Sequence, residues 1–100
     1  MKVILVPAAQ SDLETIGDFI ARENPLRAAS FLHELLDRCD GLAKFPRRFP
    51  IAEQLARSGV RKCVHGNYLI FYRITADQID VVHILHGSTD YQSFFEEGEK

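Results

Sequence analysis

The feature that most constrains this chain is a set of three strand-forming runs within residues 59–90, joined by two tight turns. The first run, residues 60–65, stops at Gly66 and Asn67, a pair suited to the positive φ angles of a two-residue hairpin loop. The second run, residues 68–74, is apolar or aromatic at six of its seven positions. These apolar side chains fall on both faces, which is typical of a central strand.

A second turn, at residues 75–78, leads into a third run at residues 79–86, which is rich in β-branched side chains. Because neighbouring runs joined by tight turns pair antiparallel, we predict a three-stranded meander. A further short strand is predicted at residues 2–6. The sequence leaves its place in the sheet open.

Two amphipathic helices are predicted upstream of the meander. In residues 8–22, apolar side chains, Phe19 among them, recur at helical spacing. Asn24 and Pro25 then end this helix and begin the next, because asparagine caps a helix and proline fits its first turn. Residues 25–44 carry the clearest apolar stripe, and the short link makes the two helices an antiparallel hairpin. The stripe consists of Ala28, Phe31, Leu32, Leu35, Leu36, Cys39 and Leu42.

These elements predict an α+β fold of order β-α-α-β-β-β, with the helical hairpin packed on one face of a small, mainly antiparallel sheet. Residues 1–100 are expected to form a single domain. Residues 45–58 contain two prolines and are expected to cross the surface, with one helical turn at residues 53–57. Residues 88–95 are expected to fold back on the body, and residues 96–100 to fray. The side chains expected to pack there are Tyr91, Phe94 and Phe95.

The composition is that of an ordinary soluble protein, with 46% apolar and 26% charged residues. A formal net charge of −2 and a pI near 6.0 imply no general attraction to nucleic acid or to acidic membranes. Arg47 and Arg48 form a small basic spot, for which solvated loop charges are the favoured interpretation. Cys39 and Cys63 lie in apolar runs and are predicted to be buried, reduced thiols. The first apolar run is too short for a signal peptide and no run has transmembrane length, so we expect a cytoplasmic protein without a membrane partner.

The residues predict neither a metal site nor a catalytic group, and no cofactor is expected. His83 and His86 are three apart on a predicted strand, so their side chains point to opposite faces, and no histidine has zinc spacing. Cys39 lies in the core stripe of a helix, and the acidic residues are scattered over helix surfaces.

Some residues of the meander allow more than one interpretation. Tyr68, Tyr72 and Arg73 could form a stacking platform for nucleic acid. The alternative, in which they pack within the sheet beneath the helices, is favoured by the composition. Arg61 and Asp90 could pair across the sheet as a structural tie.

Several short signatures occur in order along the chain. In the helical half they are Ala9, Asp12, Leu13, Ile16, Phe19, Ile20, Asn24, Pro25, Ala28, Ala29, Phe31, Leu42 and Pro46. In the meander they are Gly59, Val60, Arg61, Tyr68, Ile70, Phe71, Tyr72, Arg73, Val82, Ile84, Leu85, His86, Gly87 and Asp90. With the order of the elements, they resemble the ParE branch of the ParE/RelE toxin family, from bacterial toxin–antitoxin modules that stabilise plasmids. The resemblance covers residues 3–90, and one departure is Thr89, where the family often carries arginine.

The resemblance implies different activities for the two branches of this family. The RelE branch cuts messenger RNA on the ribosome with basic side chains on the sheet and a C-terminal tyrosine. At those positions this chain keeps Arg61 and has Cys63, Leu69, Thr89 and Phe95 at the others. RNA cleavage needs cations that hold the scissile phosphate and stabilise its developing charge, so it is disfavoured.

The ParE branch lacks that nuclease set and is similar to proteins that poison DNA gyrase, stalling it with cleaved DNA. The resemblance therefore implies an inhibitor that acts by binding and is not an enzyme. It also implies a ParD-like antitoxin that wraps the toxin in a hetero-oligomer. The alternatives are a RelE-like messenger RNA endoribonuclease and a toxin-fold protein without target activity. No direct sequence-specific nucleic-acid binding is expected.

The central strand holds more apolar surface than one layer of helices is expected to cover. Because large exposed apolar patches mark binding sites, we expect the sheet face away from the helices, or its edge, to take an antitoxin segment. The candidate antitoxin- or target-binding residues are Arg61, Tyr68, Tyr72, Arg73, His86 and Asp90.

Overall fold

The computed structural model describes residues 1–96, without the side chains of Gln54, Ala56, Arg57 and Glu96. The elements in chain order are β1 (Lys2–Leu5), α1 (Pro7–Ala21), α2 (Pro25–Gly41), the 3-10 helix η1 (Glu53–Ser58), β2 (Arg61–His65), β3 (Tyr68–Ile74), β4 (Gln78–His86) and α3 (Gln92–Glu96). The predicted α+β fold is confirmed, and η1 is the helical turn expected in the connection. From residue 97 onward, the fraying predicted for the C-terminus lies outside the described residues.

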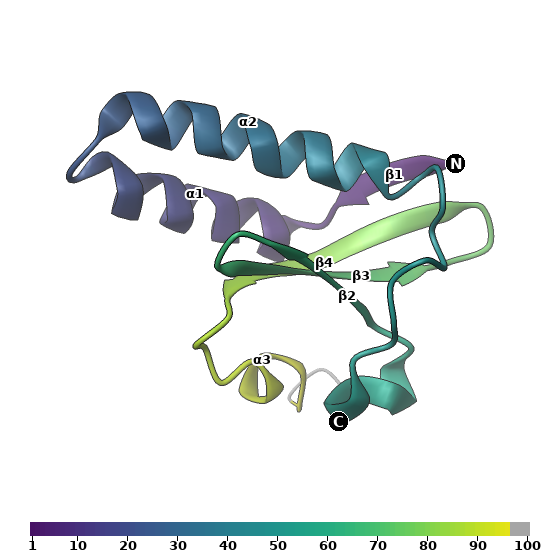
Figure 1. Cartoon of the computed structure of the whole chain (residues 1–100). Coiled ribbons are helices and arrows are strands. Elements are labelled where there is room, and N and C mark those ends of the chain that lie inside the picture. Colours follow the sequence, from purple (N-terminus) through teal and green to yellow (C-terminus); the bar gives the residue numbers. More distant parts are fainter. Residues whose placement is uncertain (97–100) are drawn as a thin grey trace.

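The four strands form one mixed sheet of order β1-β4-β3-β2. The meander is antiparallel as predicted, with Gly66 at a φ of +59° in the turn between β2 and β3. The sequence left the place of β1 open, and the structure puts it parallel to β4, opposite Gln78–Val81. The first strand of the chain thus lies beside the last (Figure 1).

The helical hairpin covers one face of the sheet (Figure 1). Asn24 caps α2, because its side-chain oxygen accepts a hydrogen bond from the Arg27 N–H at 3.0 Å. The two helices are in close contact at Gly17, where an added Cβ would lie 2.9 Å from a Leu32 methyl carbon. No helix within residues 1–96 is long and apolar enough to cross a membrane. The core beneath the hairpin consists of Ala9, Ile16, Phe31, Leu35, Cys39, Leu42, Cys63, Ile70, Tyr72, Ile79, Val81 and Ile84.

The opposite face of the sheet is covered by η1 and α3, which corrects the expectation that this face is free for a partner (Figure 1). Apolar side chains do lie on both faces of β3, but the chain supplies the second layer itself. Phe71 is fully buried there, with the Tyr91 and Phe95 rings 4.9 and 5.3 Å from its own. The whole cluster consists of Ala52, Leu55, Val60, Phe71, Leu85 and Phe95, flanked by Leu69, Val82 and Tyr91.

An irregularity in β4 was not predicted. Phe71 lies opposite His83 and Tyr72 opposite Val81, so Val82 is one extra residue in β4. Such a bulge bends the strand and changes which face its following side chains occupy. It falls where β1 ends, at the point where β4 continues without a neighbour on that side.

Candidate functional site

A pocket of about 570 Å³ opens between α1 and the end of β4. Its walls are mostly apolar and include the Phe19 ring from α1 and the Phe94 ring from α3, which are 64% and 46% exposed. Tyr68 and His86 lie at the sheet side of the pocket. The helical spacing groups Phe19 with the apolar side chains of its helix, and the structure turns it toward the pocket.

The pocket lies along an open edge of the sheet. β1 pairs with β4 only as far as Val81, whose carbonyl accepts a hydrogen bond from the Val6 N–H at 3.1 Å. The chain then turns into α1, so within residues 1–96 no strand pairs with residues 82–86 on that side. Unpaired backbone groups on a sheet edge are able to accept an added strand.

Asp12 takes over part of the missing strand's role. Its Oδ2 atom accepts a hydrogen bond from the Ile84 N–H at 2.8 Å and lies 2.8 Å from the His83 Nδ1 atom. The side chains of Asp12 and His83 are each 16% exposed. Phe94 and Phe95 of α3 lie against the other side of the His83 ring, with centroids 5.3 Å away. This group of contacts joins α1, β4 and α3 at the border of the pocket.

Four aromatic rings form a row across this end of the sheet. The Phe31 ring on α2 lies 5.7 Å from the His65 ring and 5.5 Å from the Tyr68 ring, and Tyr68 lies 5.2 Å from His86. Burial raises the pKa of the Tyr68 hydroxyl. The His86 Nδ1 atom accepts a hydrogen bond from the Ser88 N–H at 3.1 Å. His83 faces α3 while His86 faces Tyr68, so the two histidines lie on opposite faces as predicted.

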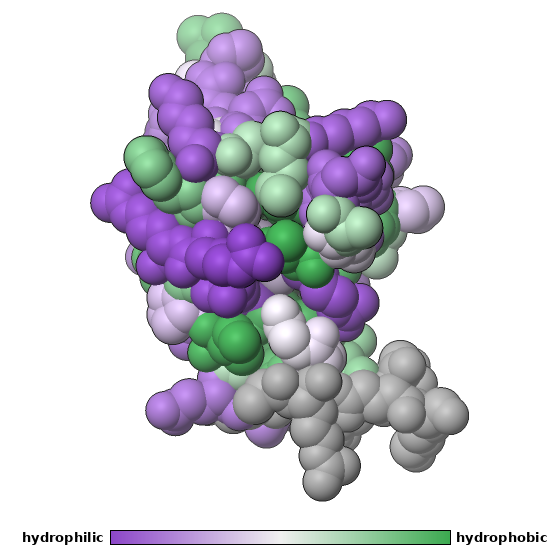
Figure 2. All heavy atoms as spheres, turned by 90° about the vertical axis from the view of Figure 1, so that its right-hand side faces the viewer, coloured by the Kyte–Doolittle hydropathy of each residue, from purple (hydrophilic) through white to green (hydrophobic). Residues whose placement is uncertain are grey.

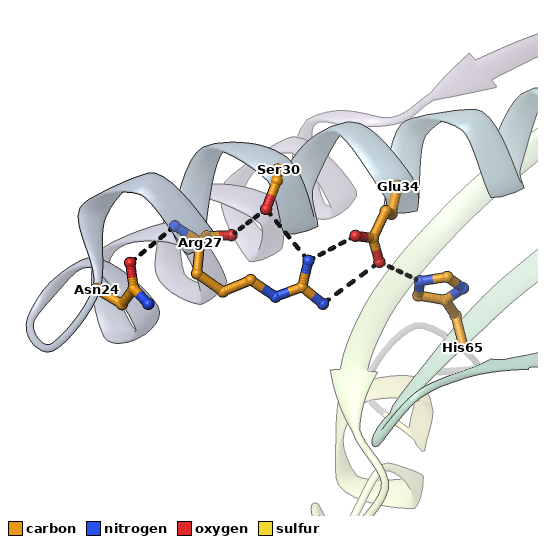
Figure 3. A network of polar contacts seen from close by, with 5 residues as sticks. All are labelled: Asn24, Arg27, Ser30, Glu34 and His65. Carbon is orange, nitrogen blue, oxygen red and sulfur yellow. Dashed lines mark hydrogen bonds and ion pairs between the residues drawn. The ribbon is translucent and has the colours of Figure 1, made fainter.

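A polar network on α2 reaches the same end of the sheet (Figure 3). Arg27 forms an ion pair with Glu34, and an oxygen of Glu34 lies 3.4 Å from the His65 Nε2 atom. The hydrogen bond from Arg27 is the main reason why the pKa of Glu34 is lowered. Ser30 also accepts a hydrogen bond from Arg27, at 3.1 Å. Because these groups are exposed, the network contributes little to stability and mainly fixes side-chain positions.

Of the six candidate residues, the structure brings together Tyr68 and His86. Arg61 lies toward the other end of the sheet, where its Nη1 atom donates hydrogen bonds to the Phe49 carbonyl at 2.6 Å and the Arg47 carbonyl at 3.3 Å. Tyr72 is fully buried, and its hydroxyl donates to the Pro46 carbonyl at 2.6 Å.

The remaining two candidates, Arg73 and Asp90, also lie apart from the pocket. Arg73 donates from Nε to the Ser58 carbonyl at 3.0 Å, which ties β3 to the end of η1. Asp90 is exposed, and no ion pair with Arg61 forms within the described residues. The expected tie is wrong because Arg61 lies opposite Tyr72, while Asp90 follows the far end of β4. The binding roles of all six residues stay predictions.

Sequence analysis missed Asp12, Phe19 and His83 as residues of this site. Asp12 had a faint signal, since it belongs to the signatures of the first helix, but its role depends on where β1 ends. The two cysteines were predicted correctly as buried free thiols. Burial raises the pKa of Cys39 to about 12 and also raises that of Cys63. Within residues 1–96, no group of three or more His, Cys, Asp or Glu side chains could hold a metal ion.

The fold itself defines a class of proteins. A chain of the chromosomal ParDE toxin–antitoxin system from P. aeruginosa is similar, with a TM-score of 0.65 and 17% identity over 86% of this chain and 95% of that one. A chain of the toxin–antitoxin complex RelBE2 from Mycobacterium tuberculosis gives a TM-score of 0.63 at 22% identity, over 85% of this chain and 95% of that one. This chain therefore has the fold shared by ParE and RelE toxins.

Sequence comparison narrows the class to one family. Residues 3–91 match the family described as the ParE toxin of the type II toxin–antitoxin system parDE. Toxin ParE1 from two strains of Mycobacterium tuberculosis is 37% identical over 91 residues, which are 89% of this chain and 92% of that protein. The chain belongs to the ParE toxin family of type II toxin–antitoxin systems.

Proposed function

We propose that this chain is the toxin of a ParDE-type module, which poisons DNA gyrase by binding it and is neutralised by a ParD-like antitoxin. The observation that carries the proposal is the apolar pocket beside an open strand edge in a chain of the ParE family. An open edge and an adjoining apolar groove suit a peptide that adds one strand and lays a helix alongside.

The pocket is a suitable seat for the antitoxin because it offers both kinds of contact at once. Apart from the Ile84 N–H, which already donates to Asp12, residues 82–86 offer backbone groups for strand addition, and Phe19 and Phe94 offer exposed rings for apolar contact. Large rings at the centre of an interface usually carry much of the binding energy. Since α3 and η1 cover the outer face, the edge is the part of the earlier expectation that we retain.

The positions that correspond to the nuclease residues of the RelE branch lie in surroundings that do not suit RNA cleavage, which favours a toxin that acts by binding. Cys63 is fully buried in the core under the helices, and Phe95 is buried beneath the sheet. Leu69 packs beside that second cluster, so three of the positions face protein instead of substrate. Arg61 alone is cationic, and its guanidinium is engaged by loop carbonyls. One cation in this setting provides little stabilisation for the negative charge that develops on the scissile phosphate during RNA cleavage.

The test is a reconstituted gyrase reaction with toxin freed of antitoxin. We expect supercoiling to fall and cleaved DNA to accumulate on gyrase, and both effects to disappear when a cognate ParD-like antitoxin is added first. Ribosomes programmed with messenger RNA serve as the matched assay. Codon-phased cuts that vanish with Arg61→Ala, without any effect on gyrase, would establish the RelE-like alternative. Inactivity in both assays would leave an antitoxin-binding protein without target activity.

A further inference from the structure

Basic side chains gather where α2 ends and the chain crosses to η1. We call Arg38, Lys44, Phe45, Arg47 and Arg48 the basic loop surface; all five are exposed, and the Phe45 ring is 68% exposed. Figure 2 views the molecule from the side on which this connection runs, and a broad band of hydrophilic side chains crosses that face beside separate hydrophobic patches. The surface lies away from the pocket beside α1, and the proposed antitoxin contact does not use it. Arg38 also serves the fold, because it donates a hydrogen bond to the Val64 carbonyl at 3.2 Å.

Hydrogen bonds from the sheet hold the backbone of this loop in place. The carbonyls of Pro46, Arg47 and Phe49 all accept hydrogen bonds from sheet side chains, one from the Tyr72 hydroxyl and two from the Arg61 guanidinium. With its carbonyls turned inward, the loop leaves the Phe45, Arg47 and Arg48 side chains exposed to solvent. A surface fixed in advance loses less conformational entropy on binding than a mobile loop does.

Aromatic and guanidinium groups alternate on this surface. The guanidinium carbons of Arg38 and Arg48 lie 5.4 and 5.5 Å from the centroid of the Phe49 ring. The Phe45 ring borders two hollows, one of about 540 Å³ shared with Lys44 and Arg47, and a smaller one of about 170 Å³ shared with Arg38 and Arg48. Rings and guanidinium planes of this kind are the groups on which unpaired bases stack.

The charges of the surface are not neutralised within the protein. Among the described residues, none of its four cations forms an ion pair with a carboxylate. Two acids of α2 are close to these cations in the chain. Asp37 lies 3.7 Å from His33 and lines the smaller hollow, and Asp40 is exposed. Four of the twelve Lys and Arg residues thus lie together in a chain whose net charge is −2. The fitting partner is therefore an extended polyanion that follows the cations, because Asp37 disfavours a small anion in the hollow.

We propose that the basic loop surface binds single-stranded DNA without sequence preference, with its four cations on phosphates and an unpaired base on Phe45. This inference rests on the proposed function, under which the toxin meets DNA that gyrase has opened. An acidic polypeptide would use the cations, but it offers a flat ring only where it carries an aromatic residue. Nucleic acid carries a flat base beside every phosphate, so it uses both the cations and the exposed ring.

The experiment is fluorescence anisotropy of purified full-length toxin with a labelled single-stranded thymidine oligonucleotide at several salt concentrations. Four phosphate contacts give a slope of about −2.8 in log affinity against log salt. Arg47→Glu is expected to weaken binding about tenfold or more and to flatten the slope. Phe45→Ala is expected to weaken single-strand binding about fivefold or more by removing base stacking, without changing the affinity for a duplex of the same length.

Arg22→Glu is the matched control, because Arg22 is an exposed arginine near the other end of α2, about 25 Å from its C-terminus. Thermal unfolding of each variant checks that it is folded, with Arg47→Ala as a second variant should the reversal destabilise the loop. The proposal is overturned if the folded wild-type protein does not bind the oligonucleotide. It is also overturned if Arg22→Glu weakens binding as much as Arg47→Glu does. If polyglutamate displaces the oligonucleotide and Phe45→Ala leaves the affinity unchanged, the surface binds an acidic polypeptide, and the proposal is likewise overturned. Tighter binding of the matching RNA overturns the assignment to DNA.

The gyrase assay separates this inference from the proposed function. If wild-type toxin traps gyrase but does not bind the oligonucleotide, the inference fails and the proposed function stands. If wild-type toxin binds the oligonucleotide but leaves gyrase unaffected, DNA binding by the basic loop surface is supported and the proposal that gyrase is the target fails. Support for both requires that Arg47→Glu lowers oligonucleotide affinity and gyrase trapping together, while Arg22→Glu lowers neither.

Discussion

Phe19 is the side chain that most directly tests the proposed antitoxin seat. Its ring is 64% exposed at the pocket and contributes little to the core, so Phe19→Ser should leave the fold intact. Loss of a central aromatic contact is expected to weaken antitoxin binding about tenfold or more. Isothermal titration with a cognate ParD-like antitoxin measures the change.

Leu26→Ser is the control for this test, because Leu26 is 86% exposed at the start of α2, away from the pocket. Its replacement removes a similar apolar side chain without touching the open edge. Equal affinities for the two variants would place the antitoxin elsewhere on the toxin.

The two thiols give the protein a dependence on alkaline pH. The pKa of Cys39 is raised to about 12 and that of Cys63 is also raised, mainly by burial, while a thiol in an unfolded chain ionises near about 8.5. The unfolded chain therefore loses these protons first, so stability is complete below about pH 8.5 and falls as the pH rises toward the folded values. We expect the urea midpoint to decrease between about pH 8.5 and 10, below the ordinary range of tyrosine.

A variant with Cys39→Ala and Cys63→Ala provides the reference for this pH dependence. It is less stable at every pH because of the cavities it creates, but its midpoint should change less over the same range. Parallel curves for wild type and variant would show that the thiols do not cause the alkaline loss.

At the scale of the element, neighbouring leucines on α2 report which side of the helix is buried. Leu35 is fully buried and Leu36 is 42% exposed, although both belong to the stripe predicted from sequence. Leu35→Ala is expected to cost about 2–5 kcal/mol of unfolding free energy, and Leu36→Ala much less. Chemical denaturation measures both, and similar losses would contradict the observed orientation of α2.

The helices and the meander could be predicted because their signals are local. The period of apolar residues, the Asn24 cap and the turn at Gly66 each lie within a few residues of the element they define. The predicted end of α2 was three residues too late, since the helix stops at Gly41 and a turn follows.

Features that depend on distant parts of the chain escaped prediction. No sequence signal near residues 2–6 indicates that this strand pairs with Gln78–Val81. The open edge is a consequence of that pairing. The burial of Tyr72 likewise depends on a carbonyl at Pro46, 26 residues away. The covering of Phe71 by α3 and the role of Asp12 at Ile84 are further cases of contacts that sequence periodicity does not encode.

For the whole molecule, the proposed partner should change stability as well as activity. A ligand that binds only the folded toxin stabilises it by about 2.7 kcal/mol at a concentration 100 times its Kd, by mass action. For a chain of 100 residues this corresponds to a rise in Tm of about 10–20 °C. Differential scanning fluorimetry with excess antitoxin measures the shift. Toxin carrying Phe19→Ser should show a smaller one, and an unchanged Tm of wild type would contradict the antitoxin assignment.

The pairing of the first strand with the last has a consequence for how the chain is made. About 75 residues must be synthesised after Leu5 before its partner Val81 exists, which takes about 4–15 s at about 5–20 residues per second. The helical hairpin depends on local contacts and is able to form during that interval, whereas the sheet closes only after β4 has left the ribosome. The pocket and its strand edge are therefore absent from the nascent chain until β4 has been made. A partner that recognises them cannot bind the earlier nascent chain, so its binding has to follow the synthesis of β4.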